Sequence, residues 1–241
     1  MSYGDMVRKL YPKEPIDKPS ALDAVHALKP ITMIGSSYFP WLDSTEAETQ
    51  NTVNGEYRHT ILHAARPVPK ELVPEWIRIK GYRRPRKWPD GLAQAMPDFF
   101  SLTQYCYCVS HEARELLDQL APNTIEYIEV LVETPPEMQC SSAYYFINVL
   151  PQARQLDWGM ADVWKWKPNQ VLQMLSENSR NVVFKPMAAG DPAIWHELSL
   201  DNDRHQSDQR MVLLRGTVWN ELIERFPFQL TQQCLTDPRV S

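Results

Sequence analysis

The chain has 241 residues, of which 43% are hydrophobic and 23% are charged, and it carries a net charge of -5. These are ordinary values for a globular protein that can bury a core without disulfide or metal staples. The mild acidity argues against a broad nucleic-acid-binding surface, because such surfaces are normally basic. The four cysteines form neither a CxxC pair nor a zinc framework. Since the chain also shows no signal-peptide core and no apolar stretch long enough to span a membrane, we expect a soluble, cytoplasmic protein.

The first 95 residues predict a Pro-rich N-terminal region that packs on the rest of the chain. Residues 21–28 predict a short helix that ends before Pro30, because the residue before a proline disfavours helical geometry. Residues 75–80 predict a strand with Trp and Arg alternating with Ile. The composition changes near residue 96, so residues 96–241 are expected to form an α+β core, with a single domain overall as the alternative.

The core begins with a regular strand and helix. Residues 105–109 are aromatic and β-branched and predict a strand, and Ser110 behind them is a good helix N-cap. One apolar helix face follows at positions i, i+3, i+4 and i+7, and it consists of Ala113, Leu116, Leu117 and Leu120. Two further strands are predicted at residues 125–132 and 143–150.

The last part of the chain repeats this order. Residues 171–175 predict a short helical turn, residues 181–185 a strand, and residues 193–200 either a strand or a helix. Residues 211–214 predict another strand, after which Gly216 and Thr217 are expected to cap a helix. Its apolar face consists of Trp219, Leu222, Ile223 and Phe226.

A unit of strand, cap, amphipathic helix and short strand is thus expected twice, at residues 105–132 and 211–230. The distance from the cap to the apolar face differs by one residue, which indicates a recurring motif and no proven duplication. We predict an α+β fold with a mixed, mainly antiparallel sheet and amphipathic helices packed on it.

Two histidines have the spacing of a metal site. His59 and His63 lie at i and i+4, which is the ligand spacing of a zincin helix. Thr60 stands where such a site needs its general-base glutamate, and no third ligand is evident. We therefore favour two partly exposed structural histidines and predict neither a metal nor a cofactor.

An acidic loop at residues 201–208 starts like a calcium loop. It has Gln206 where such a loop needs glycine, and Val212 where it needs the final glutamate. We favour a solvated loop, with a partner-facing loop as the alternative, because loops often carry binding residues. The basic run at residues 83–88 is likewise interpreted as solvated.

Two tryptophans, Trp164 and Trp166, lie two residues apart and would share one face of a strand. Core packing is the usual fate of tryptophan, although tryptophans in a Pro-bounded loop are also typical interface anchors.

No residue pattern indicates a nucleophile. The chain has no GxSxG elbow and no phosphate-binding glycine loop, and it contains 8 glycines in all. Glu126 and Glu129 lie three apart in a predicted strand and would point to opposite faces, which is unsuitable for acid/base catalysis. We therefore predict no catalytic residues and no enzymatic activity.

Residues 60–230 resemble a family of bacterial polymorphic-toxin immunity proteins, immunity protein eleven, to which the immunity protein forty-three family is similar. The resemblance rests on these segments: Pro97-Asp98-Phe99, Val109-Ser110 with its helix, Ile125 to Val130, Tyr144 to Val149, Leu156-Asp157, and the closing unit from Leu213 to Phe228. The chain differs in its longer Pro-rich N-terminus and in having Pro227 where the pattern has glycine.

The resemblance implies a cytoplasmic protein that protects its producer by binding a cognate secreted toxin and occluding its active site. The partner would be a single toxin molecule, and if the toxin is a basic nuclease an acidic surface would steer it. The candidate partner-binding residues are Asp201, Asp203, Asp208, Trp164 and Trp166, with Glu46 and Glu48 as further acidic candidates.

Two alternatives remain open from the sequence. The chain is a metal-dependent hydrolase that uses His59 and His63, or it is a structural adaptor of a secretion system. Metal content of the purified protein separates the first alternative from a binding protein, because a catalytic zinc with three protein ligands co-purifies.

Overall fold

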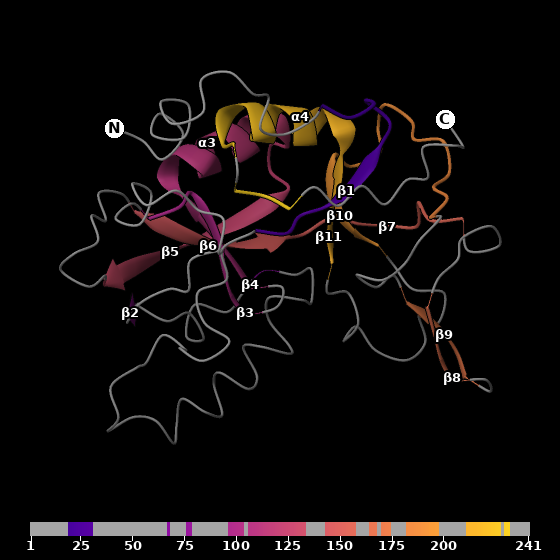
Figure 1. Ribbon diagram of the computed structural model, residues 1–241, viewed down its shortest axis with the longest axis horizontal. Helices are drawn as coiled ribbons and strands as arrows, with labels where there is room; N and C mark the ends of the chain where they lie inside the picture. The colour runs from indigo at the N-terminus through magenta and orange to yellow at the C-terminus, as the bar shows by residue number, and fades with distance from the viewer. Residues whose placement is uncertain are drawn as a thin grey trace.

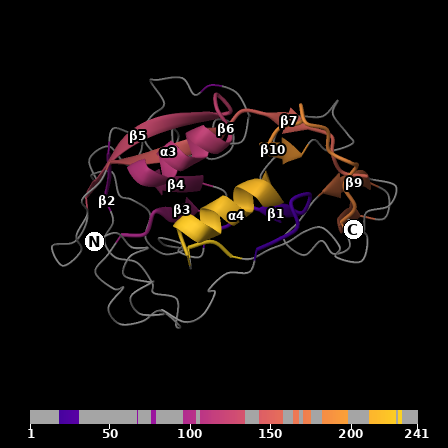
Figure 2. The same ribbon diagram turned by 90° about the horizontal axis from the view of Figure 1, so that it is seen from above.

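A computed structural model describes residues 19–30, 67, 76–78, 96–103, 106–133, 143–157, 164–167, 170–174, 182–197, 211–227 and 229–231. Within these residues the chain forms a five-stranded sheet, a four-stranded sheet, a two-stranded hairpin and two helices. Both helices lie on the same side of the two larger sheets, as Figures 1 and 2 show. The predicted α+β fold is confirmed.

The five-stranded sheet has the order β2-β5-β6-β4-β3. Its strands are β2 (Trp76–Arg78), β3 (Phe99–Thr103), β4 (Cys106–Ser110), β5 (Ile125–Glu133) and β6 (Tyr144–Val149). All neighbours are antiparallel except β2 and β5, which run parallel. The predicted strands at residues 75–80, 105–109, 125–132 and 143–150 are therefore confirmed.

The four-stranded sheet has the order β1-β11-β10-β7. Its strands are β1 (Val25–Ala27), β7 (Gln152–Ala153), β10 (Ile194–Glu197) and β11 (Val212–Arg215). Only β10 and β7 pair in parallel. β1 comes from the Pro-rich N-terminal region, so this region supplies an edge strand to the C-terminal sheet. A separate antiparallel hairpin consists of β8 (Trp164–Lys167) and β9 (Gln170–Met174).

Three local predictions need correction or refinement. The helix predicted at residues 21–28 is wrong, because Val25, His26 and Ala27 are all buried and pair with β11 as a strand. The helical turn predicted at residues 171–175 is also wrong, since β9 pairs with β8 there. Pairing between strands outweighs local preference at both places. Residues 193–200, left open between strand and helix, contain β10. At residues 181–185 the described part contains bridge residues at Val182 and Phe184, and Phe184 pairs with Leu156.

Helix α3 (His111–Leu120) begins as predicted. Ser110 is its N-cap, and its side chain accepts a hydrogen bond of 3.2 Å from the backbone N–H of Ala113. Ala113 and Leu117 are buried, and Leu116 and Leu120 pack partly buried against the same core. The predicted apolar face is confirmed.

Helix α4 (Gly216–Arg225) starts differently from the prediction. Its N-cap is Arg215, which makes no side-chain capping bond, so the predicted cap at Gly216 and Thr217 is wrong. The chain enters the helix directly from β11, and the N–H of Gly216 donates to the carbonyl of Ala24 at 2.6 Å. A Cβ atom at Gly216 would collide with the carbonyl oxygen of Ala21. Close backbone approach therefore explains this glycine, and capping does not.

The strand-and-helix unit occurs twice with the same register. In the first unit β3 pairs with β4 so that Phe99 faces Val109, and α3 starts two residues after Val109. In the second unit β10 pairs with β11 so that Ile194 faces Leu214, and α4 starts two residues after Leu214. Each helix ends in the same way, with a cap N–H that donates four residues back, to Leu117 in α3 and Leu222 in α4.

A third antiparallel strand completes each unit on its other side. β6 pairs with β4 so that Tyr145 faces Val109, and β1 pairs with β11 so that His26 faces Leu214. The third strand follows its helix in the first unit, whereas in the second it comes from the N-terminal region. The two units thus share one arrangement with different connections, and Tyr145 and His26 are equivalent positions.

The main core lies between the two helices and the two sheets. It contains Leu117 from α3, Trp219 and Leu222 from α4, and inward-facing residues of both sheets, namely Phe99, Val109, Tyr145, Ile147, Val149, Ile194, Val212 and Leu214. A second cluster, which includes Val25, Trp195 and Leu213, lies on the opposite face of the four-stranded sheet. Because one core spans both sheets, the two helices are held at fixed positions on a shared surface.

Candidate functional site

Most of the predicted partner-binding residues lie outside the described part of the chain. These are Asp201, Asp203 and Asp208, with Glu46 and Glu48, and the same holds for the histidine pair His59 and His63 and for the basic run at residues 83–88. Trp164 and Trp166 lie in β8, whose pairing with β9 shifts register between Lys165 and Lys167. The candidate site below therefore rests on other residues.

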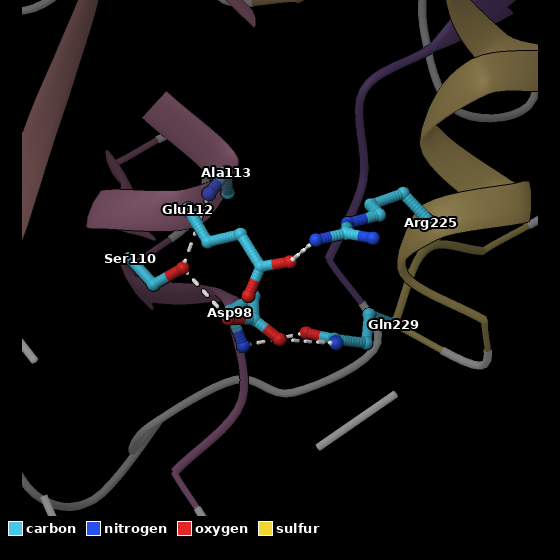
Figure 3. Close-up of polar contacts among 6 residues, drawn as sticks. All are labelled: Asp98, Ser110, Glu112, Ala113, Arg225 and Gln229. Carbon is cyan, nitrogen blue, oxygen red and sulfur yellow. Dashed lines mark hydrogen bonds and ion pairs between the residues drawn. The ribbon is translucent and has the colours of Figure 1, made fainter. Parts of the chain in front are cut away.

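The surface formed by α3 and α4, here called the helical face, is an exposed feature of the described residues. The two helices lie on the same side of the sheets in both views (Figures 1 and 2). An ion pair between Glu112 of α3 and Arg225 of α4 joins them, as Figure 3 shows. Both helices are amphipathic, so one side of each is buried in the core while the other carries charged side chains outward.

The helical face is acidic. Its carboxylates are the partly exposed Glu112 and the exposed Glu115, Asp118, Glu221 and Glu224. Two guanidinium groups belong to the same helices, those of Arg114 and Arg225, and the second is paired with Glu112. Carboxylates therefore outnumber arginines on this face, and a surface of this sign attracts basic partners.

One side of α3 carries a cluster of aromatic and cationic groups. The guanidinium of Arg114 lies 4.6 Å from the ring centre of Tyr145 and 5.3 Å from that of Tyr127. His111 lies next to it, with Nδ1 3.3 Å from the Tyr145 hydroxyl and Nε2 3.2 Å from Glu115. Burial raises the pKa of Tyr127, and the charge of Asp118 adds to this effect. The tyrosine consequently stays neutral and presents a π face to the arginine.

The equivalent positions in the second unit are buried. Trp219 occupies in α4 the position that Arg114 occupies in α3, and His26 occupies in β1 the position of Tyr145 in β6. The rings of His26 and Trp219 are stacked, with centroids 4.4 Å apart and planes 3° apart, and both residues are fully buried. The equivalent pair is therefore fully buried in the second unit, whereas in the first unit Tyr145 is buried and Arg114 is partly exposed.

A buried polar network lies beneath the helical face (Figure 3). Asp98 accepts hydrogen bonds from the Ser110 hydroxyl at 2.7 Å and from the Gln229 amide at 2.8 Å. The carbonyl oxygen of Gln229 accepts from the backbone N–H groups of Asp98 and Phe99 at 2.6 and 3.0 Å. Burial raises the pKa of Asp98, while the bonds from Ser110 and Gln229 act against this rise. The network fixes β3, the start of α3 and the segment after α4 relative to one another.

A second buried carboxylate, Glu197, holds the segment after β7. It accepts from the backbone N–H of Leu156 at 2.9 Å, from that of Gln155 at 3.2 Å, and from the Trp195 indole N–H at 3.0 Å. Burial raises its pKa, and these hydrogen bonds act in the opposite direction. Its oxygens bind groups of the fold itself, so its role is structural.

Two buried histidines have lowered pKa values. Burial lowers the pKa of His26 and of His196 to about 4, so both are neutral at pH 7. His196 Nδ1 lies 3.2 Å from the carbonyl oxygen of Met211. His26 has no hydrogen-bond partner for either ring nitrogen among the described residues. Both serve the packing of the four-stranded sheet, since neither reaches the surface.

The described residues contain no group of three or more His, Cys, Asp or Glu side chains placed to hold a metal ion. Among the helices in these ranges, none is long and apolar enough to cross a membrane. Cys108 is buried and forms no disulfide with another described residue.

The stacked arginine, the buried network and the His26–Trp219 pair were not predicted from the sequence. The spacing of the prolines could have indicated the repeated unit. Pro97 and Pro192 precede β3 and β10 by the same number of residues, and Pro122 and Pro227 likewise follow α3 and α4 by the same number. Aligning the chain on these prolines places Arg114 opposite Trp219.

Comparison with known proteins adds no relative. No protein-family model matches the chain, and no curated protein does either.

Proposed function

We propose that this chain is an immunity protein that binds a secreted bacterial toxin in the cytoplasm of the producing cell and neutralises it by covering its active site. The observation that carries the proposal is the helical face, which carries five carboxylates and an arginine whose guanidinium lies over the ring of Tyr145. Arginine and tyrosine are enriched among the residues that dominate binding energy in protein interfaces. The resemblance of residues 60–230 to immunity proteins supports the same function.

The physical mechanism is occlusion by a rigid, charged surface. One core holds both helices, and the Glu112–Arg225 pair and the Asp98 network fix their neighbouring ends. A surface that is already ordered loses little conformational entropy when it binds, so more of the contact energy appears as affinity. An acidic face also increases the association rate with a basic toxin, particularly at low salt.

The acidic loop at Asp201, Asp203 and Asp208 remains a second contact candidate, together with Trp164 and Trp166. Reversing the three aspartates to lysine is expected to weaken toxin binding, with a larger loss at low salt. Unchanged affinity at low and moderate salt would remove the loop from the proposal and leave the helical face.

The proposal is tested by complex formation. The chain is co-expressed with a catalytically inactive product of the adjacent upstream gene, and the purified material is analysed by size-exclusion chromatography with light scattering. We expect a stable one-to-one complex of the two chains. Absence of a complex at micromolar concentration contradicts the proposed function, because neutralisation requires slow dissociation.

A further inference from the structure

The pair of Arg114 and Tyr145, in which the tyrosine is buried and the arginine is partly exposed, carries an inference that rests on the function proposed above. Its equivalent, Trp219 on His26, is fully buried and contributes only to the core. In the first unit the helix instead supplies a cation at this position, and the side chain of Arg114 is partly exposed. The repeated architecture therefore provides a buried aromatic ring on the third strand, and the first unit places a partly exposed guanidinium over it.

The guanidinium of Arg114 has N–H donors that no described residue uses. No hydrogen bond or ion pair joins it to another described residue, and the contacts that hold it are the rings of Tyr145 and Tyr127. Of the carboxylates on α3, Glu112 pairs with Arg225 and Glu115 with His111. Asp118 lies one helical turn after Arg114 and acts on the same Tyr127 ring, but no ion pair joins the two among the described residues. A stacked guanidinium keeps its five N–H donors in a fixed planar fork, and this fork matches a carboxylate in bidentate geometry.

The charges of the helical face determine which groups of a partner protein are attracted to it. A basic partner is attracted by the five carboxylates of the helical face, and these carboxylates repel an acidic side chain of that partner. Of the two guanidinium groups on this face, that of Arg225 is paired with Glu112, which leaves Arg114 as the one that can bind a partner carboxylate. An acidic side chain of the partner thus finds one favourable position, and this position fixes the register of the complex.

We propose that Arg114, held on the ring of Tyr145, is the anchor that binds a carboxylate side chain of the partner protein. The carboxylate accepts two hydrogen bonds from the guanidinium, and the tyrosine ring supports the guanidinium from behind. The acidic residues of the helical face increase the association rate, and Arg114 slows dissociation.

The test measures binding kinetics of the full chain with the inactive product of the adjacent upstream gene. Arg114→Ala is expected to weaken affinity about 30-fold, as loss of an interface hot spot does, mainly through faster dissociation. Arg114→Lys keeps the charge without the planar fork and is expected to recover only part of this loss. Arg154→Ala, which removes an exposed arginine next to β7, is the matched control and is expected to bind like the wild type.

A double-mutant cycle identifies the carboxylate. Each Asp and Glu of the partner is replaced by alanine in turn, and one of these variants is expected to abolish most of the effect of Arg114→Ala. Circular dichroism and thermal unfolding of each variant confirm that the fold is kept, and Arg114→Lys tests the anchor if Arg114→Ala does not fold.

The outcomes separate this inference from the proposed function. If the wild-type chain forms no complex, the proposed function fails and the inference fails with it. If the wild type binds and Arg114→Ala or Arg114→Lys binds equally tightly, only the anchor is overturned. The anchor is also overturned if no partner carboxylate couples to Arg114.

Discussion

The ring of His26 lies flat on the indole of Trp219, with 3° between their planes, as the guanidinium of Arg114 lies over the ring of Tyr145. In both pairs the helix contributes its fourth residue, Trp219 in α4 and Arg114 in α3. The neighbouring strand contributes the other residue, His26 opposite Leu214 and Tyr145 opposite Val109. Both residues of the first pair are fully buried, whereas in the second pair Tyr145 is buried and Arg114 is partly exposed. Arg114 belongs to the proposed binding face, whereas the pair of His26 and Trp219 is expected to determine stability.

Trp219 is expected to be essential for stability. It is fully buried in the main core, and large-to-small changes of such residues cost about 3–5 kcal/mol through lost burial and the cavity left behind. Trp219→Ala should therefore unfold the chain or lower its free energy of unfolding by about this amount. Trp219→Phe keeps a ring on His26 and is expected to lose less. Urea unfolding followed by circular dichroism measures both, and equal losses would contradict a role for the stack.

Acid should destabilise the protein through its buried histidines. The folded-state pKa of His26 and His196 is about 4, below the ordinary value of 6.5, so folding favours the neutral form. Their contribution is fully present above pH 6.5 and is lost as the pH falls toward 4, with a slope of up to about 1.4 kcal/mol per pH unit for each histidine. The folded-state pKa of Asp98 and Glu197 is raised, so folding favours their protonated form. Their contribution to the free energy of unfolding therefore has the opposite pH dependence, and it is lost as the pH rises through the raised folded-state pKa.

His26→Phe isolates one histidine from these opposing effects. The variant keeps an aromatic ring on Trp219 but has no titrating group. Between pH 6.5 and 4 the free energy of unfolding should fall more in the wild type than in this variant. A difference that stays constant over this range would show that His26 does not titrate in the expected way.

Gly216 is expected to tolerate no side chain. A Cβ atom at this position meets the backbone carbonyl of Ala21, which belongs to the turn that precedes β1. Gly216→Ala should destabilise the protein by about 1–3 kcal/mol, as overpacking does. The control is Gly190→Ala, since no atom lies within 4 Å of the added Cβ there, and its effect should stay within about 0.5 kcal/mol. Thermal unfolding of the two variants distinguishes local crowding from a general effect of glycine replacement.

Charge reversal on α4 should slow association with a basic toxin. Glu221 and Glu224 are exposed, so Glu221→Lys together with Glu224→Lys removes two negative charges and adds two positive charges without disturbing the core. We expect a lower association rate, a smaller dependence of that rate on salt, and a nearly unchanged dissociation rate. Stopped-flow binding at two salt concentrations tests this, and an unchanged association rate at low salt would remove α4 from the binding surface.

The sequence indicated the strands and helices that have strong local patterns. Ser110 and the apolar face of α3 identified that helix together with its cap, and aromatic and β-branched runs identified β4, β5 and β6. The α+β class followed from the order of these elements. These features depend on neighbours along the chain, which is why periodicity detects them.

Features that depend on distant partners were missed. β1 was interpreted as a helix because its strand character comes from pairing with β11, far along the chain. The start of α4 was misplaced because Gly216 is explained by the approach of Ala21. The Asp98 network joins β3 to Gln229, and no local pattern links residues so far apart. Most of the predicted binding residues lie outside the described residues, and they remain predictions.

The central claim is neutralisation of a toxin, and growth measures it most directly. The toxin from the adjacent upstream gene is induced in cells that carry the wild-type chain, Arg114→Ala or Arg154→Ala. We predict that the wild type and Arg154→Ala restore growth and that Arg114→Ala does so only at higher expression. Continued growth arrest with the folded wild-type chain present at an excess over the toxin would contradict the account.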